Sequence, residues 1–160
     1  MYGIHGVCCV MDVEERTVDK KPVTYLALEP VGQGGTRYLV PTHNATAMSK
    51  LRPMLSRAEL EALLSSDQVH TDCWIKDENH RKQAYRELIS KGDMGKLLQM
   101  VRSLYWHRQT QLSAGKKCHI CDENFLRDAE KLVVSEMGIV LEMTPDVAKT
   151  YLKQKLNEDA

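Results

Sequence analysis

The sequence of 160 residues predicts an α+β fold, in which a small antiparallel β-barrel or curled sheet precedes a bundle of about five helices. Two observations predict this fold. Residues 1–53 contain short β-branched runs that end at turns rich in Gly and Pro, with no helical period between them. From Ser56 onward the apolar residues recur at helical spacing. We therefore expect a β domain over residues 1–53 and a helical domain over residues 54–160.

Three strands are expected in the β domain. Residues 7–13 are β-branched and cysteine-rich, and a polar turn at residues 19–22 separates them from a second run over residues 23–28. A glycine-rich turn closes the second run, and residues 36–40 form the third, which ends at Pro41. Leu51 and Arg52 are a candidate for a last short strand.

The helical domain carries clear start and stop signals. Ser56 and Glu59 have the spacing of a capping box ahead of the first helix, and Gly92 is a stop signal for the second. Thr144 followed by Pro145 is typical of an N-cap and a first helical residue. The expected helices begin after Ser56, cover residues 78–90, 94 to about 109 and 122 to about 143, and run from Pro145 through Leu152.

The zero net charge of the chain hides a basic middle segment. Lysine and arginine total 22, as do aspartate and glutamate. Residues 76–117, however, contain ten basic and four acidic residues, whereas residues 118–160 contain five basic and nine acidic residues. Such a basic stretch favours a local anion-binding surface. The alternative is a pair of solvated helices whose lysines face water.

Cysteine count and hydropathy indicate the compartment. Five cysteines is an odd number for a secreted disulfide framework, and the sequence has no signal peptide. No apolar run approaches the roughly 20 residues that span a bilayer. We therefore expect a soluble, cytoplasmic protein in a reducing compartment, with no membrane partner.

One short motif has the spacing of a metal site. Cys118, His119 and Cys121 resemble half of a zinc site, because a two-residue spacer lets both sulfurs reach one ion. The other half is missing, so buried or incidental thiols are the alternative. No nucleophile–base motif and no glycine-rich phosphate loop is present, and we expect neither an enzyme nor a cofactor.

Trp74 precedes the most basic predicted helix, and this pair suggests nucleic-acid binding. Cations that follow a phosphate backbone, beside an apolar ring that wedges against bases, are a known arrangement for DNA. The alternative for Trp74 is packing at a helix start. The candidate DNA-binding residues are Trp74, Arg81, Lys82, Arg86 and Lys91.

Two further side chains stand out on the later helices. Glu136 falls on the apolar stripe of the predicted helix 122–143, where a carboxylate is costly unless it is paired. We expect it to be buried in a structural ion pair with Arg102 or Arg108. Trp106 falls opposite the apolar face of the helix that begins at Met94, where it either contacts a partner or packs under a neighbouring helix.

A series of short motifs, in order along nearly the whole chain, resembles a known protein family. The motifs are Tyr2–Val7 leading into Val13-Glu14, Tyr25–Leu28, Tyr38–Pro41 followed by Asn44-Ala45, Leu51-Arg52, Leu88–Asp93, Val101–Tyr105 and Ala129–Glu136. Together they resemble the CarD family of bacterial transcription regulators that bind RNA polymerase. The docking module of transcription-repair coupling ATPases is related, but this sequence has no motor motifs.

The resemblance implies a fold, partners and a mode of action. It implies an N-terminal Tudor-like β-barrel that docks on the β subunit of RNA polymerase. It also implies a C-terminal helical domain that contacts promoter DNA near the upstream edge of the melted bubble, through backbone and minor groove and without reading sequence. Such a protein modulates open-complex stability and takes no small-molecule substrate. Arg16 matches a polymerase-docking position of the family.

The β domain departs from the family pattern at two positions. The family normally has a further strand before the Tyr2 motif, whereas here Met1 directly precedes Tyr2, so either the start is truncated or the barrel lacks an edge strand. If the strand is missing, residues 7–13 become a sheet edge, and we expect another chain to cover that edge or the barrel to be frayed. A second docking arginine of the family corresponds to Leu39 here. Arg37 lies two residues earlier, on the same face of a strand, and replaces it.

The wedging aromatic is a third departure. The family places this tryptophan closer to the basic helix, whereas Trp74 lies a few residues further upstream. Direct alignment puts Asn79 at the wedge position.

Overall fold

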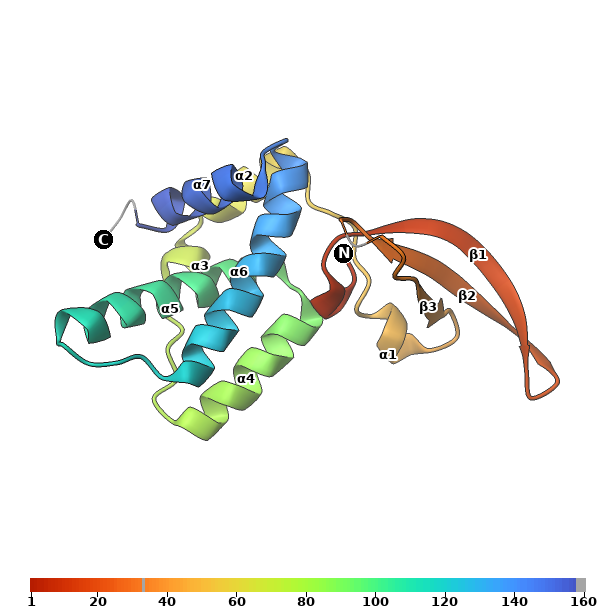
Figure 1. Cartoon of the computed structure of the whole chain (residues 1–160), viewed down its shortest axis with the longest axis horizontal. Coiled ribbons are helices and arrows are strands. Elements are labelled where there is room, and N and C mark those ends of the chain that lie inside the picture. The colour runs from red at the N-terminus through yellow and green to blue at the C-terminus, as the bar shows by residue number, and fades with distance from the viewer. Residues whose placement is uncertain (33, 158–160) are drawn as a thin grey trace.

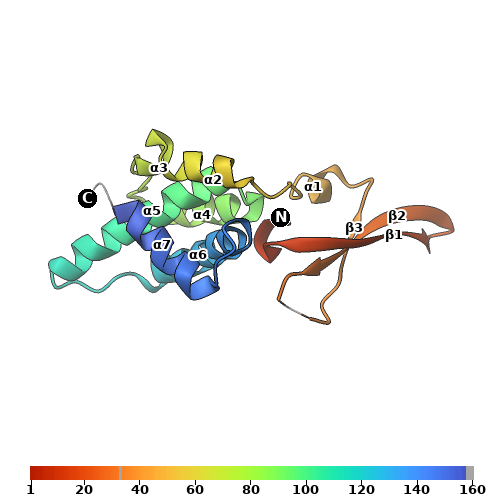
Figure 2. The same cartoon turned by 90° about the horizontal axis from the view of Figure 1, so that it is seen from above.

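The computed structural model describes residues 1–32 and 34–157 and confirms the α+β fold. A three-stranded antiparallel sheet lies at one end of an elongated molecule, and the longer helices gather at the other (Figures 1 and 2). The chain passes from the sheet half to the helical half through residues 49–56, and Figure 1 places the N-terminus at the same junction. None of the helices in the described part of the chain is long and apolar enough to span a membrane.

The sheet is dominated by one long hairpin. Strands β1 (Cys8–Val18) and β2 (Lys21–Pro30) pair over nearly their whole length, and the short β3 (Tyr38–Pro41) pairs with β2 on the other side. The turn consists of Asp19 and Lys20, both with positive φ, a conformation that matches the right-handed twist of the flanking strands. The hairpin therefore extends past the predicted strand ends and projects away from the helices (Figure 1).

The three strands form an open sheet, so of the two predicted forms, a barrel or a curled sheet, the structure has the sheet. Within residues 1–32 and 34–157, the only pairing outside these three strands is an isolated bridge between Tyr2 and Leu51. β1 therefore lies at an edge, and Val10, Met11 and Val13 on it are exposed. The predicted covering of this edge by another chain stays a prediction.

In the described part of the helical half, the structure has the five predicted helices and one additional one-turn helix, α3 (Asp67–His70). The capping box of Ser56 with Glu59 is present, and Gly92 ends the second predicted helix with a φ of 68°. The sequence analysis missed two one-turn helices, because four residues are too few to show an apolar period. The bounds are η1 (3-10) Gly3–His5, α1 Ala45–Met48, α2 Arg57–Leu64, α3 Asp67–His70, α4 Glu78–Lys91, α5 Met94–Ser113, α6 Ile120–Val140 and α7 Pro145–Asn157.

Helix α5 is the centre of the helical core. Its buried side chains contact α2, α3, α4 and α6, and α7 packs on the outer side of α6. This packing fixes the start of α4, the end of α5 and the start of α6 relative to one another. The largest buried apolar residues of this core are Leu60, Tyr85, Leu97, Leu98, Met100, Met137, Leu152 and Leu156.

Glu136 is fully buried, but its predicted partners are wrong. The Glu136 carboxylate accepts two hydrogen bonds from the Arg52 guanidinium, at 2.8 and 2.6 Å, and one from the Leu55 backbone N–H at 3.0 Å. Arg102 instead donates to the His70 carbonyl, and Arg108 pairs with Glu123. The ion pair thus joins α6 to the segment between sheet and helices, whereas we expected it to join α5 and α6.

Arg52 also connects the junction to the end of α4. Its Nε donates to the Gly92 carbonyl at 2.8 Å, and the two backbone groups of Arg52 bond to Met1. The Cα atom of Gly3 lies 3.5 Å from the position that a Cβ on Gly92 would occupy. One arginine and two glycines therefore hold the sheet half against the helical half.

Candidate functional site

Three separate groups of charged and aromatic side chains carry the residues that the sequence analysis singled out. Arg16 and Arg37 lie on the sheet half, Lys82, Arg86 and Lys91 lie on α4, and Trp74 with Arg81 lies in a pocket of the helical half. We describe each group in turn.

Arg16 and Arg37 converge on one carboxylate. Arg16 on β1 and Arg37 just before β3 both form an ion pair with Glu14, at 2.8 and 2.7 Å. Half of each arginine side chain remains exposed, at 53% and 49%. The curl of the sheet brings the two together although β2 separates their strands. A guanidinium carries five donors, so both retain free N–H groups for a carboxylate of a partner.

The basic side chains of α4 differ in how free they are. Lys82 is ion-paired with Glu78 one turn earlier on the same helix. Arg86 and Lys91 are exposed, and neither forms an ion pair within residues 1–32 and 34–157. Their charges are therefore available to an anionic partner.

Arg81 is buried, and this burial disfavours its predicted contact with DNA. Only 3% of its surface is exposed. Its guanidinium donates to both carboxylate oxygens of Asp122, at 2.9 and 3.0 Å, and to the carbonyls of Ile75 and Lys76. Two of these bonds join α4 to the start of α6 and two hold the segment before α4, so Arg81 is committed to contacts inside the helical half.

Trp74 is half-buried and forms part of an aromatic stack. Its ring lies parallel to the His107 imidazole with centroids 3.4 Å apart, and the Arg81 guanidinium carbon lies 4.2 Å from its centroid. These contacts favour the alternative reading, packing at a helix start, over a protruding wedge. The exposed tryptophan is Trp106, with 55% of its surface accessible.

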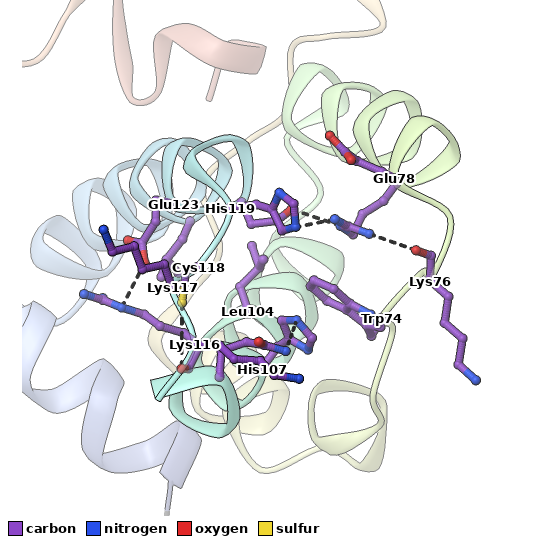
Figure 3. Close-up of a pocket in the computed structure, with 15 residues that line it drawn as sticks. Trp74, Lys76, Glu78, Leu104, His107, Lys116, Lys117, Cys118, His119 and Glu123 are labelled. Carbon is purple, nitrogen blue, oxygen red and sulfur yellow. Dashed lines mark hydrogen bonds and ion pairs between the residues drawn. The ribbon is translucent and has the colours of Figure 1, made fainter. Parts of the chain in front are cut away.

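A pocket of about 470 Å³ opens beside this stack (Figure 3). It lies between the segment before α4, the second half of α5, the loop after α5 and the start of α6. Leu104 and Leu126 supply apolar surface, and Trp74 and His107 supply aromatic surface. The other lining residues are Lys76, Glu78, Arg81, Arg108, Gln111, Lys116, Lys117, Cys118, His119, Asp122 and Glu123.

The negative charges that line the pocket are ion-paired, whereas several of its positive charges are not. Each lining carboxylate has a cationic partner: Asp122 pairs with Arg81, Glu123 with Arg108, and Glu78 with Lys82. The lysines at positions 76, 116 and 117 are exposed and have no ion pair in the described part of the chain. The pocket is therefore bordered by three free ammonium groups.

Burial shifts the pKa values of two lining groups. Burial lowers the pKa of His107, and the nearby Arg81 charge acts in the same direction, so the imidazole is neutral at neutral pH. Burial also raises the pKa of the Cys118 thiol, whose S–H donates to the Arg108 carbonyl at 3.8 Å. A neutral imidazole is the form that stacks beside a guanidinium without repulsion.

The cysteines do not assemble a metal centre in the described structure. Cys118 precedes α6 and Cys121 lies in its first turn, and both are free thiols. Across residues 1–32 and 34–157, no three His, Cys, Asp or Glu side chains are grouped to hold a metal ion. The zinc alternative for Cys118, His119 and Cys121 therefore has no structural support.

Comparison with known families assigns both halves of the chain. Residues 1–52 match the CarD-like/TRCF RID domain, which is Tudor-like, and residues 59–153 match the CarD C-terminal domain. These are the domains of transcription-related regulators that interact with RNA polymerase. The chain belongs to the CarD family. A search of curated proteins gave no match.

Several residues of these sites were missed from the sequence. His107 and the lysines at positions 76, 116 and 117 belong to no motif, and they come together only through the packing of the helices around the pocket. Arg52 lies in the Leu51-Arg52 motif, but its contact with Glu136 spans 84 residues of sequence. The adjacent Lys116 and Lys117 at the end of the basic segment were the one signal that could have indicated a charged rim.

Proposed function

We propose that this protein docks on the β subunit of RNA polymerase through its sheet half and contacts promoter DNA through its helical half. In this way it modulates the stability of the open complex without reading sequence. The observation that carries the proposal is the separation of two cationic surfaces, one on each half, across a bonded junction. A protein built in this way can bind two partners at once.

The docking surface consists of Arg16 and Arg37. Their ion pairs with Glu14 orient both guanidiniums, and their half-exposed donors suit a bidentate contact with carboxylates of a protein partner. The family membership supports RNA polymerase as that partner. The β subunit is the specific partner that we propose.

The DNA surface consists of Lys82, Arg86 and Lys91 on α4. Arg86 and Lys91 have no competing carboxylate among the described residues, so their full positive charge is available to phosphates. Contacts of this kind give affinity without sequence preference. Arg81 is excluded from this surface because Asp122 occupies it.

The protein acts by binding rather than by catalysis in this proposal. The matched domains are interaction and regulatory domains. Activation and repression both follow from the same contacts, since a stabilised open complex also slows promoter escape.

The test is a pair of double charge reversals. We expect Arg16→Glu with Arg37→Glu to lose polymerase binding in a β-subunit pull-down while keeping its affinity for free DNA. We expect Arg86→Glu with Lys91→Glu to keep polymerase binding but to lose the effect on open-complex half-life, because reversed charges repel phosphates.

The matched control is Arg57→Glu with Arg127→Glu, two exposed arginines that lie on neither surface. It should behave as the unmodified protein in both assays. Equal loss of polymerase binding by both test pairs would contradict the two-surface proposal.

A further inference from the structure

The junction between the two halves carries a lysine that neither surface of the proposed function includes. Lys50 comes just before Leu51 and Arg52, at the end of the sheet half, and it is exposed. Its ammonium group forms no ion pair in the part of the chain that the structure describes. The charge of Lys50 is therefore available to an anionic partner.

Contacts around Gly3 place the Lys50 side chain beside the end of α4. The Gly3 N–H donates to the Lys50 carbonyl at 3.0 Å. The Cβ and Cδ atoms of Lys50 lie 3.7 and 3.8 Å from the position that a Cβ on Gly3 would occupy, so the aliphatic part of the lysine lies across this glycine. The same position lies 2.9 Å from the Ser90 carbonyl oxygen of α4. Lys50 thus lies against the helical half, where η1 meets α4 (Figure 1).

The cations of α4 form a row that leads to this point. Lys82, Arg86 and Ser90 are spaced by four residues, so they lie one after another along the same side of the helix. Each step of four residues rises about 6 Å. Because the Ser90 carbonyl borders Gly3, Lys50 lies at the end of the row. The positive side chains therefore continue from the helical half across the junction to the sheet half.

An extended row of this kind suits a nucleic-acid backbone better than a compact anion. Each strand of duplex DNA carries one phosphate per about 3.4 Å of its axis, so cations spread over two helical turns can meet several phosphates. A single carboxylate or free phosphate would contact only one of them. The ion pair within the row, between Lys82 and Glu78, lies at the end far from Lys50.

We propose that Lys50 binds a phosphate of the DNA backbone, so that the DNA surface runs from α4 across the junction onto the sheet half. This inference rests on the proposed function, because Arg86 must contact the same DNA. The added contact depends on how the two halves are joined, since Lys50 and Arg86 belong to different halves. Loss of this one contact weakens DNA binding without abolishing it.

The test compares the salt dependence of DNA affinity among variants of the full chain. Fluorescence anisotropy with a labelled promoter duplex gives the slope of log affinity against log salt. We expect Lys50→Gln to flatten this slope by about one unit, and Lys50→Arg, which keeps the charge, to leave it unchanged. Lys50→Gln combined with Arg86→Gln should flatten the slope by about two units, because two phosphate contacts are lost.

The matched control is Lys21→Gln, at an exposed lysine in the first position of β2, with the same change in charge. Its slope should equal that of the unmodified protein. Equal flattening by Lys50→Gln and Lys21→Gln would overturn the inference, since net charge rather than position would then determine the slope.

Arg86→Gln separates a failure of this inference from a failure of the proposed function. If Arg86→Gln flattens the slope and Lys50→Gln does not, the contact at Lys50 is wrong and the α4 surface stands. If Arg86→Gln leaves the slope unchanged, the proposed DNA surface is wrong, and the inference about Lys50 is overturned with it.

Discussion

At the residue scale, Glu136 shows how a buried charge is accommodated. Its carboxylate has no exposed surface, and three hydrogen bonds from Arg52 and Leu55 compensate for lost hydration. Glu136→Ala leaves the Arg52 guanidinium and the Leu55 N–H without their acceptor. We expect the free energy of unfolding to fall by about 3–5 kcal/mol, as measured by urea denaturation.

The control for this prediction is Glu87→Ala, an exposed glutamate on α4. We expect a change within about 0.5 kcal/mol there. A Glu136→Ala protein as stable as the Glu87→Ala protein would mean that the ion pair contributes nothing net.

His107 should make the stability of the fold depend on pH, and its surroundings determine the sign of that dependence. Burial, followed by the Arg81 charge, lowers its pKa from the ordinary value of 6.5, while Asp122 and Asp72 act in the opposite direction. Below about pH 6.5 His107 binds a proton in the unfolded chain more readily than in the folded chain. The free energy of unfolding therefore keeps its full value above that pH and decreases as the pH falls. We expect the melting temperature to drop between about pH 7 and about pH 5.

The contribution of His107 is isolated by His107→Phe, which keeps an aromatic ring against Trp74. Its melting temperature should fall less over the same pH interval. His5, whose pKa burial also lowers, accounts for part of the remaining drop. If the wild-type and variant curves ran parallel, His107 would not titrate as we infer.

The burial of Glu136 could be predicted from the sequence, whereas its partner could not. The apolar stripe of α6 predicts which positions are buried, because burial follows helical period. The partner is set by a contact across 84 residues of sequence between α6 and the segment after the sheet, which no local pattern encodes. The burial of Arg81 could not be predicted for the same reason, since its partner Asp122 lies 41 residues away in the sequence.

At the scale of elements, the contact between η1 and the end of α4 depends on glycine. Gly3 has a φ of 44°, and a Cβ there would lie 2.9 Å from the Ser90 carbonyl oxygen. Gly3→Ala therefore combines backbone strain with a collision against main chain that cannot move freely. We expect a loss of roughly 2–4 kcal/mol in the free energy of unfolding.

Gly115→Ala separates these two effects. Gly115 has a φ of 67°, but a Cβ there meets nothing within 4 Å. It should lose only about 1–2 kcal/mol, the cost of the left-handed conformation. Equal losses at both positions would show that the η1–α4 contact tolerates an added methyl group.

The helices and strands could be predicted wherever a local sequence signal was strong. Capping residues such as Ser56 and Gly92 located the long helices, because they satisfy helix ends through neighbouring backbone groups. The sequence predicted either a barrel or a curled sheet, because strand spacing does not determine whether the first and last strands meet. The one-turn α1 and α3 also have side-chain caps, at Asn44 and Ser66, but four residues are too few to show the apolar period that marks a helix.

At the scale of the whole molecule, the two charged surfaces predict different salt dependences. Each phosphate contact releases about one counterion, so Arg86→Gln should flatten the slope of log affinity against log salt by about one unit on duplex DNA. Arg16→Gln, on the sheet half, should leave this slope unchanged. Fluorescence anisotropy with a promoter duplex at several salt concentrations measures both slopes, and equal slopes for both variants would contradict the assignment.

The junction around Arg52 has a genetic consequence. Arg52 bonds simultaneously to Glu136, to Gly92 and to the Met1 backbone, so the angle between the two halves is set there and nowhere on the binding surfaces. A screen for loss of regulation should therefore recover substitutions at Gly3, Arg52 and Gly92 in proteins that still bind polymerase and DNA separately. Such variants would be defective only when one molecule must bind polymerase and DNA at the same time. A change in the length of the segment that joins the sheet half to the helical half would not restore their function.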